Sequence, residues 1–169
     1  MREGGETVAE SDTPEGEARE IIAREKYMSP DDITWSVKPE NSLFRVYSCP
    51  LTDSDNASIP GLSAELAFRV PARYHDACKY TFSVFRFTPI GRQRVYQLEV
   101  IPEDDRGHNE DEAPCYGPHE HIGTLVQEVR VAHLDCRHHE KWFRVFLQNA
   151  NIKYGGRYIG PFDGGLFES

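Results

Sequence analysis

The sequence predicts an α+β fold: a mainly antiparallel sheet of about five to six strands, with a C-terminal helix packed on one face and a looser N-terminal helix. Two observations lead to this prediction. From Ile33 onward, apolar and polar residues alternate with a period of two, which is typical of strands that have one buried face. Near each end of the chain, over residues 15–28 and 140–150, the apolar residues instead follow a helical spacing.

The N-terminal segment is expected to lie outside the packed domain. Residues 1–13 are small, polar and acidic, so they are predicted to form a disordered acidic tail. The remaining residues, 14–169, are predicted to form a single domain, because a chain of 169 residues is the size of one ordinary domain. No apolar run is long enough to span a bilayer, and the N-terminus lacks the apolar core of a secretory signal. We therefore expect a cytoplasmic protein that does not contact membranes.

The two helices differ in the apolar face that they present. The N-terminal helix is predicted to begin at a Thr13 cap with Pro14 in its first position, and it has few apolar residues. We expect it to be a surface helix. The C-terminal helix has a continuous apolar stripe, which is expected to pack on the core and is formed by Trp142, Phe143, Phe146 and Leu147.

The strands are predicted over residues 33–37, 43–47, 64–70, 80–88, 92–101 and 119–128. The strand over 80–88 is apolar on both sides, so it is expected at the centre of the sheet. Residues 50–63 are rich in Ser, Asp, Asn, Pro and Gly and are predicted to form a loop. The glycine-rich segment 154–169 is expected to pack as an irregular strap.

The charge of the chain is negative and unevenly distributed. The formal net charge is -9, of which residues 1–60 contribute -7 and residues 61–169 contribute -2. This balance argues against broad, charge-driven binding of nucleic acid, which needs a basic surface. Residues 103–112 contain six acidic residues and are predicted to be a solvated loop, with binding of a cation or a partner as the alternative.

Most of the residues that could perform chemistry lie between 106 and 140, where six of the seven histidines are found. His119 and His121 are two residues apart in a predicted strand, so their side chains are expected on the same face. Two adjacent imidazoles can act as an acid–base pair near neutral pH, or can bind one metal ion. A pair of edge-strand histidines that face water is the alternative without function.

The same region also contains candidate zinc ligands. Thiolates and imidazoles from two segments could converge on one ion, although the close pairing of two cysteines that marks zinc knuckles is absent. This candidate set consists of Cys115, His119, His121, Cys136 and His138. The four cysteines do not indicate a disulfide scaffold, and Cys49 and Cys78 are expected to be buried free thiols. No glycine-rich phosphate loop is present, so no large cofactor is expected, and zinc is the alternative that the candidate ligands leave open.

A further candidate pair lies on the strand over 92–101. Arg94 and Tyr96 are two residues apart and are expected to share a strand face, where Arg94 could bind a phosphate and Tyr96 could orient it or relay a proton. A cross-strand packing pair is the simpler alternative. Glu99 is expected on the opposite face and therefore apart from both residues.

The segment from Arg92 onward contains a strand of the type R-x-Y-x-L-x-V, then His108-Asn109, then the sequence Gly-Pro-His-x-His over residues 117–121. In these motifs it resembles a group of small, largely uncharacterised prokaryotic proteins associated with mobile elements. Some toxins of toxin–antitoxin modules share such a His-x-His motif. The resemblance implies an RNA-directed, toxin-like activity with an antitoxin partner, and it places His108, His119 and His121 in the site.

These observations leave three functional hypotheses. The first is a metal-independent ribonuclease in which His119 and His121 act as acid and base while Arg94 or Arg106 stabilises the transition state. The second is a non-enzymatic acidic inhibitor or adaptor from a phage or mobile element, which mimics nucleic acid as anti-CRISPR proteins do and binds a host defence complex. The third is a structural domain stabilised by zinc. The expected partner is therefore RNA or a host or phage protein complex.

Overall fold

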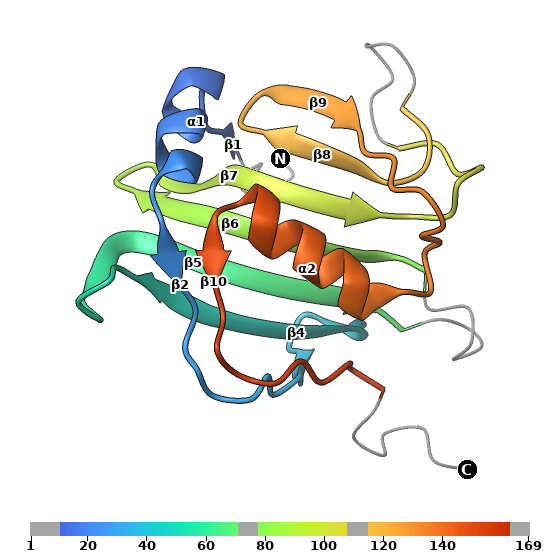
Figure 1. The fold of residues 1–169 in the computed structure, drawn as a ribbon, viewed down its shortest axis with the longest axis horizontal. Coiled ribbons are helices and arrows are strands. Elements are labelled where there is room, and N and C mark those ends of the chain that lie inside the picture. Colours follow the sequence, from blue (N-terminus) through green and yellow to red (C-terminus); the bar gives the residue numbers. More distant parts are fainter. Residues whose placement is uncertain (1–10, 71–77, 108–114, 163–169) are drawn as a thin grey trace, which may run out of the picture.

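A computed structural model describes residues 11–70, 78–107 and 115–162, and over these residues the chain is mostly sheet (Figure 1). The predicted fold class is wrong. Ten strands form a single curled, mixed sheet, and the described residues contain only two short helices, α1 (Glu15–Ala23) and α2 (His139–Asn149). The predicted number of strands, about five to six, is too low mainly because three two-residue segments pair with the sheet. In addition, most of the predicted loop over residues 50–63 belongs to two long strands.

The central strands are long and antiparallel, whereas those at the two edges are short. Along the sheet the order is β10-β2-β4-β5-β6-β7-β8-β9, with β3 paired to β4 and β1 paired to β7. The pairs β1–β7 and β10–β2 are parallel. The strands are β1 (Ser11–Asp12), β2 (Lys26–Tyr27), β3 (Ser36–Lys38), β4 (Asn41–Thr52), β5 (Ser58–Arg69), β6 (Tyr80–Thr88), β7 (Gly91–Val100), β8 (His119–Ile122), β9 (Leu125–Glu128) and β10 (Ile152–Lys153).

The segment predicted as a loop over 50–63 is mostly strand. β4 continues to Thr52 and β5 begins at Ser58, so the connection is a short turn. The Asp53 carboxylate holds this turn by accepting hydrogen bonds from the backbone amides of Asp55 and Ala57. Polar composition suggested a loop, but Ile59 and Leu62 are buried and start the apolar face of β5.

Both helices lie on one face of the sheet. In Figure 1, α2 crosses the middle of the sheet and α1 lies near β7 and β8. Phe146 of α2 stacks on Tyr96 of β7 and packs against Phe82 of β6, with ring centroids 6.0 and 5.7 Å apart. The expected apolar stripe of the C-terminal helix is therefore confirmed as core, with Trp142 and Phe143 fully buried beside Phe146.

The N-terminal region enters the sheet earlier than the sequence predicts. Residues 11 and 12 form β1, the backbone amide of Thr13 donates to the carbonyl oxygen of Arg94, and Thr13 is fully buried. The remainder of the predicted tail, residues 1–10, lies outside the described residues. Gly123 in the β8–β9 turn allows this approach, because its φ is +54° and a Cβ there would lie 2.1 Å from the carbonyl oxygen of Thr13.

Helix α1 ends at Ala23, whereas the sequence predicts a helix that continues to residue 28. Lys26 ends it. Its ammonium group is buried and donates hydrogen bonds to the carbonyl oxygens of Ile21, Ile22 and Arg24 at the C-terminal end of the helix, where Ile21 also accepts from the backbone amide of Arg24. Burial, followed by the nearby charge of Arg24, lowers the pKa of Lys26 to about 8. Neither helix in the described part of the chain is long and apolar enough to cross a membrane.

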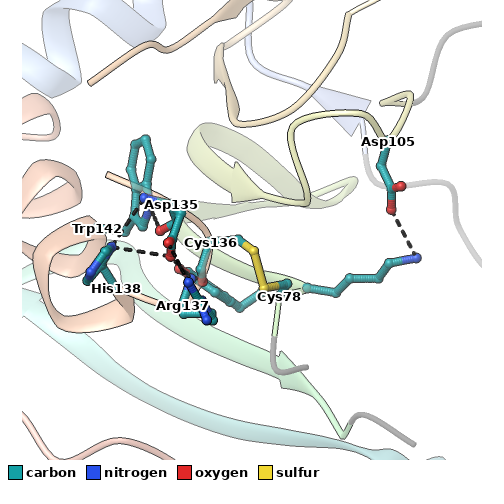
Figure 2. The surroundings of a disulfide bond; sticks show 9 residues. Cys78, Asp105, Asp135, Cys136, Arg137, His138 and Trp142 are labelled. Atoms are coloured by element: carbon teal, nitrogen blue, oxygen red, sulfur yellow. Dashed lines mark hydrogen bonds and ion pairs between the residues drawn. A yellow bond between two sulfur atoms is a disulfide. The ribbon is translucent and has the colours of Figure 1, made fainter. Parts of the chain in front are cut away.

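A disulfide joins Cys78, immediately before β6, to Cys136, immediately before α2 (Figure 2). The prediction that Cys78 is a buried free thiol is therefore wrong. Cys49 and Cys115 are free and buried. Because the bonded cysteines are 58 residues apart in the sequence, their pairing depends on the sheet and could not be found from local spacing.

Candidate metal centre

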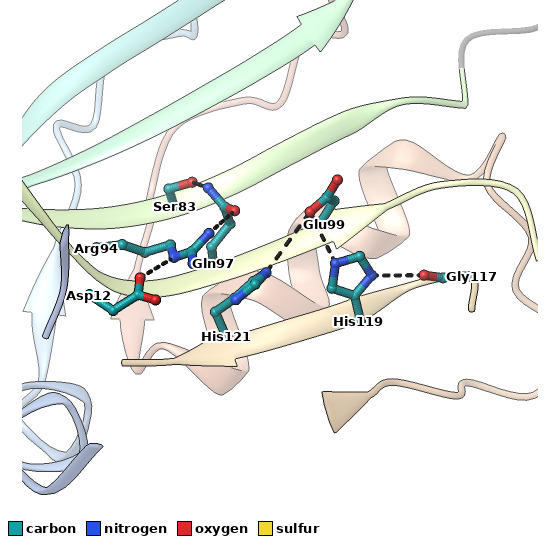
Figure 3. A network of polar contacts seen from close by, with 8 residues as sticks. All are labelled: Asp12, Ser83, Arg94, Gln97, Glu99, Gly117, His119 and His121. Carbon is teal, nitrogen blue, oxygen red and sulfur yellow. Dashed lines mark hydrogen bonds and ion pairs between the residues drawn. The ribbon is translucent and has the colours of Figure 1, made fainter. Parts of the chain in front are cut away.

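His119 and His121 lie on the same face of β8, as the strand alternation predicts, and Glu99 of β7 lies opposite them (Figure 3). In the register of the two strands Glu99 pairs with His119, and Gln97 pairs with His121. This face is turned away from Tyr96 and α2. One ligand atom of each of Glu99, His119 and His121 lies within 4.8 Å of the others. We call these three residues the triad.

The distances in the triad are close to those of a coordination sphere. The Oε2 atom of Glu99 lies 3.0 Å from Nε2 of His119 and 3.9 Å from Nε2 of His121. Ligand atoms that bind zinc tetrahedrally at about 2.1 Å are about 3.4 Å apart. Small rotations of these side chains would therefore place all three atoms around one ion.

The imidazole of His119 is oriented by the backbone. Its Nδ1 atom donates to the carbonyl oxygen of Gly117 at 2.9 Å, which leaves Nε2 directed at Glu99. A backbone carbonyl that accepts from the second ring nitrogen is the usual arrangement behind a metal-binding histidine. The backbone of Gly107 passes so close that a Cβ there would lie 2.8 Å from Cε1 of His119. Glycine at this position therefore lets the chain cover the ring.

His121 is the unusual member of the triad. Its side chain is buried, at 6% exposure, yet neither ring nitrogen has a hydrogen-bond partner among the described residues. The separation of 3.9 Å from Glu99 is too long for a hydrogen bond. Buried polar groups without partners are rare in folded proteins, and an absent ion is one of the standard explanations.

The surroundings of the two histidines shift their pKa values in opposite directions. For His119, burial alone would lower the pKa, but the hydrogen bonds to Glu99 and Gly117 outweigh it and raise the pKa above its ordinary 6.5. For His121, burial lowers the pKa more than the neighbouring Glu99 carboxylate raises it, and the charges of Arg94 and His119 add to the lowering. The geometry agrees for His119: its Nδ1 donates to Gly117, and the 3.0 Å contact between its Nε2 and a carboxylate oxygen of Glu99 needs a proton between the two atoms when no ion is bound.

The structure separates Arg94 from Tyr96, so the prediction that they share a face is wrong. The β6–β7 register shifts between Val84 and Phe85, and Val95 of β7 has no cross-strand partner in β6. This β-bulge inverts the alternation at one residue. As a result Arg94 lies on the face of the triad, where it donates to Asp12 and Gln97 (Figure 3).

Tyr96 lies on the opposite face, where its hydroxyl donates to Glu120 at 2.9 Å. Burial, followed by the charge of Glu120, raises its pKa. The prediction that Glu99 lies on the face opposite both Arg94 and Tyr96 therefore holds for Tyr96 and is wrong for Arg94. Glu99 was not among the predicted site residues. It belongs to the triad because the pairing of β7 with β8 places it directly opposite His119.

The predicted zinc set does not assemble. Cys136 is bonded to Cys78, and His138 is exposed at the start of α2, where Nδ1 accepts from the backbone amide of Asp135 (Figure 2). Cys115 is buried but does not belong to the group of converging ligand atoms in the described part of the chain. His108, which the resemblance placed in the site, lies outside the described residues. Of the five residues in the predicted zinc set, only His119 and His121 have converging ligand atoms.

The fold and the triad define a mixed-sheet protein in which a partly buried carboxylate and two buried histidines form a cluster on the sheet face opposite its helices. No protein-family model, curated protein or solved structure matches this chain. The function proposed below therefore depends on the chemistry of the site.

Proposed function

We propose that the chain is a metal-dependent enzyme that binds one divalent transition-metal ion, zinc first, through Glu99, His119 and His121. The single observation that supports this most strongly is the buried imidazole of His121 without a hydrogen-bond partner among the described residues. A ligand is needed to compensate its burial. Neutral imidazole is the form that binds metals, and the lowered pKa of His121 keeps it neutral at pH 7.

The proton between His119 and Glu99 fits this proposal. An ion would displace that proton and occupy the space between the carboxylate and both Nε2 atoms. His119 would keep its Nδ1 hydrogen bond to Gly117, so its ring need not turn. The triad therefore has a proton-bound form and a metal-bound form that differ little in side-chain position.

Three protein ligands support a catalytic role for the ion. Structural zinc sites are closed by four protein ligands, whereas catalytic sites use three, commonly His2Glu, and leave a position for water or substrate. In such a site the ion acts as a Lewis acid or lowers the pKa of a bound water. Two histidines and a carboxylate also bind iron(II) in oxygenases, so the identity of the metal is part of the test.

Metal binding fits the geometry better than the metal-independent acid–base mechanism. The His119 and His121 side chains are 1% and 6% exposed, and their Nε2 atoms face Glu99. An acid–base pair must reach the scissile bond of its substrate within hydrogen-bond distance. An internal phosphodiester of RNA does not reach ring nitrogens that are buried against Glu99, whereas a metal ion fits between them.

The test measures metal content and affinity. Protein treated with a chelator and dialysed is titrated with Zn²⁺, Fe²⁺ and Mn²⁺ by calorimetry, and bound metal is measured by mass spectrometry. We expect one ion per chain, with Zn²⁺ bound most tightly. Glu99→Gln, which preserves shape, and His121→Gln should weaken zinc binding by about 100-fold or more, since each removes one of three ligands.

His138→Ala is the matched control, because it removes a histidine of the predicted zinc set that lies outside the triad. This variant should bind zinc as the wild type does. Wild-type protein that binds no metal, or equal zinc affinity in all variants, would overturn the proposal. Tight iron(II) binding with weak zinc binding would retain the triad as the metal site and overturn the choice of zinc.

A further inference from the structure

A cavity of about 340 Å³ lies beside the triad, and Glu99 forms part of its wall. It is located where β5 ends, β6 begins and β7 ends. Ala67, Thr81 and Glu99 are cross-strand neighbours, so their side chains share one face of the sheet. Because Ala67 and Thr81 are small, they leave space between Glu99 on one side and Arg69 and Phe44 on the other.

The lining of this cavity is basic although the whole chain has a net charge of -9. Three cationic side chains line it, those of Arg69, Lys79 and Arg106. Lys79 pairs with Asp105 at 3.6 Å, and Glu99 faces the histidines. Within the described part of the chain, the guanidinium groups of Arg69 and Arg106 have no ion-pair or side-chain hydrogen-bond partner.

Two guanidinium groups without carboxylate partners are suited to an anion with several oxygens. Guanidinium donates paired N–H bonds whose spacing matches the oxygens of a phosphate. The half-buried ring of Phe44 adds an apolar wall next to Arg69, its cross-strand neighbour in the β4–β5 pair. The volume is at the lower end of the range for small-molecule sites, which fits a ligand of about mononucleotide size.

We propose that this cavity binds the phosphate group of a phosphate ester, with Arg69 and Arg106 as the phosphate-binding residues. As a statement about substrate, this inference rests on the metal centre proposed above. Glu99 is the shared element, because it lines the cavity and belongs to the triad. A phosphate bound by Arg69 and Arg106 therefore lies next to the ion position.

The reaction that this arrangement supports is hydrolysis of the ester. The oxygen of water forms a bond to phosphorus, the bond between phosphorus and the ester oxygen breaks, and the leaving oxygen takes up the proton that water releases. The positive charges of Arg69 and Arg106 stabilise the charge that develops on the phosphate oxygens. The products are inorganic phosphate and an alcohol when the substrate is a monoester.

The test is calorimetric binding of inorganic phosphate to chelator-treated protein and to zinc-loaded protein at constant ionic strength. Arg69→Ala and Arg106→Ala should each weaken phosphate binding by about tenfold or more, because each removes charge-assisted hydrogen bonds. Arg144→Ala is the matched control, since Arg144 is an exposed arginine of α2 that pairs with Glu140. This control should bind phosphate as the wild type does.

Binding of a nucleoside 5′-monophosphate and of a 5′-phosphorylated RNA oligonucleotide then identifies the source of the phosphate. Tighter binding of the monophosphate indicates a small-molecule substrate, and tighter binding of the oligonucleotide indicates an RNA end. Phosphate that does not bind, or binds equally to wild type and both arginine variants, overturns the inference.

The failure of the two proposals can be distinguished. If zinc binds and phosphate does not, the cavity is not the substrate site and the metal centre stands. If phosphate binds to the chelator-treated protein and zinc never binds, the cavity is an anion site and the metal centre is wrong. Arg69→Ala and Arg106→Ala should keep wild-type zinc content, because neither residue is a ligand.

Discussion

Successive residues of β8 contribute to two buried polar clusters on opposite faces of the sheet, and the clusters differ in completeness. Glu120 faces the helices, where Tyr96 and Asn149 donate to its Oε2 and Gln127 donates to its Oε1. His119 and His121 face the other way, where His121 has no such partner among the described residues. We call the first the closed network and compare it with the triad.

The closed network has the hydrogen bonding expected of a structural cluster, whereas the triad has that expected of a ligand-binding site. A buried carboxylate whose oxygens all accept hydrogen bonds is compensated within the fold, so nothing further is needed there. A buried imidazole with neither nitrogen bonded is compensated only when something binds. Changes to the closed network should therefore alter stability, whereas changes to the triad should alter metal binding.

The largest expected change in stability comes from the disulfide, which fixes the segment before α2 and thereby supports the face of the closed network. Replacing both Cys78 and Cys136 with serine removes a cross-link between residues 58 positions apart. The unfolding free energy should fall by about 4 kcal/mol, from the greater entropy of the unfolded chain. Urea unfolding measures this loss, and zinc affinity should be unchanged. An unchanged midpoint would contradict a stabilising cross-link.

Removal of the closed network's acceptor should have the next largest effect. Glu120→Ala leaves the buried hydroxyl of Tyr96 and the amides of Gln127 and Asn149 without their acceptor. We expect a loss of about 3 kcal/mol in unfolding free energy, measured by urea unfolding. Glu120→Gln, which keeps an acceptor oxygen, should lose less. If Glu120→Ala retained full stability and lost zinc binding, the assignment of the two roles would be reversed.

The same two clusters show how far the sequence could predict the site. The strand period was enough to place His119 and His121 together on one face, because that inference uses only residues two apart. Glu99 was not recognised as a partner, since its position opposite His119 depends on the register between β7 and β8. Pairing of distant segments also hid the disulfide and the two-residue strands β1, β2 and β10.

One bulged residue accounts for the wrong placement of Arg94. Alternation places Arg94 and Tyr96 on the same face, and it would do so for any regular strand. The extra residue Val95 inverts the pattern, and no local signal such as glycine marks it. Similarly, the polar composition of residues 50–63 obscured the start of β5, where the buried residues Ile59 and Leu62 are three apart and a regular alternation begins only at Leu62.

The pH dependence of zinc affinity tests whether a proton and the zinc ion compete for His119. His119 must lose its proton to bind an ion, and its pKa is raised, so protons compete with zinc below that pKa. Affinity should fall by about tenfold for each pH unit below the pKa of His119. In the metal-free protein the sign is opposite: stability from protonated His119 is fully present below pH 6.5 and is lost as the pH rises through the folded pKa.

Calorimetry from about pH 5.5 to 8 in buffers of different ionisation enthalpy measures both the affinity and the number of protons released. We expect release of about one proton on the acid side of the pKa of His119 and of fewer above it. His121 should contribute little near neutral pH, because its pKa is lowered. A zinc affinity that does not change over this range would contradict the proton between His119 and Glu99.

The smallest effect compares two buried tyrosines with different acceptors. Tyr96 donates to the carboxylate of Glu120 at 2.9 Å, and Tyr80 donates to the carbonyl oxygen of Cys136 at 2.7 Å. Hydrogen bonds to charged groups contribute more than those to neutral groups, so Tyr96→Phe should lose about 1 kcal/mol more unfolding free energy than Tyr80→Phe. Both variants bury the same ring, so paired urea unfolding isolates the hydroxyl. Equal losses of unfolding free energy would mean that the negative charge of Glu120 adds no stability to the closed network. The closed network would then differ from the triad only in that all of its polar groups have hydrogen-bond partners.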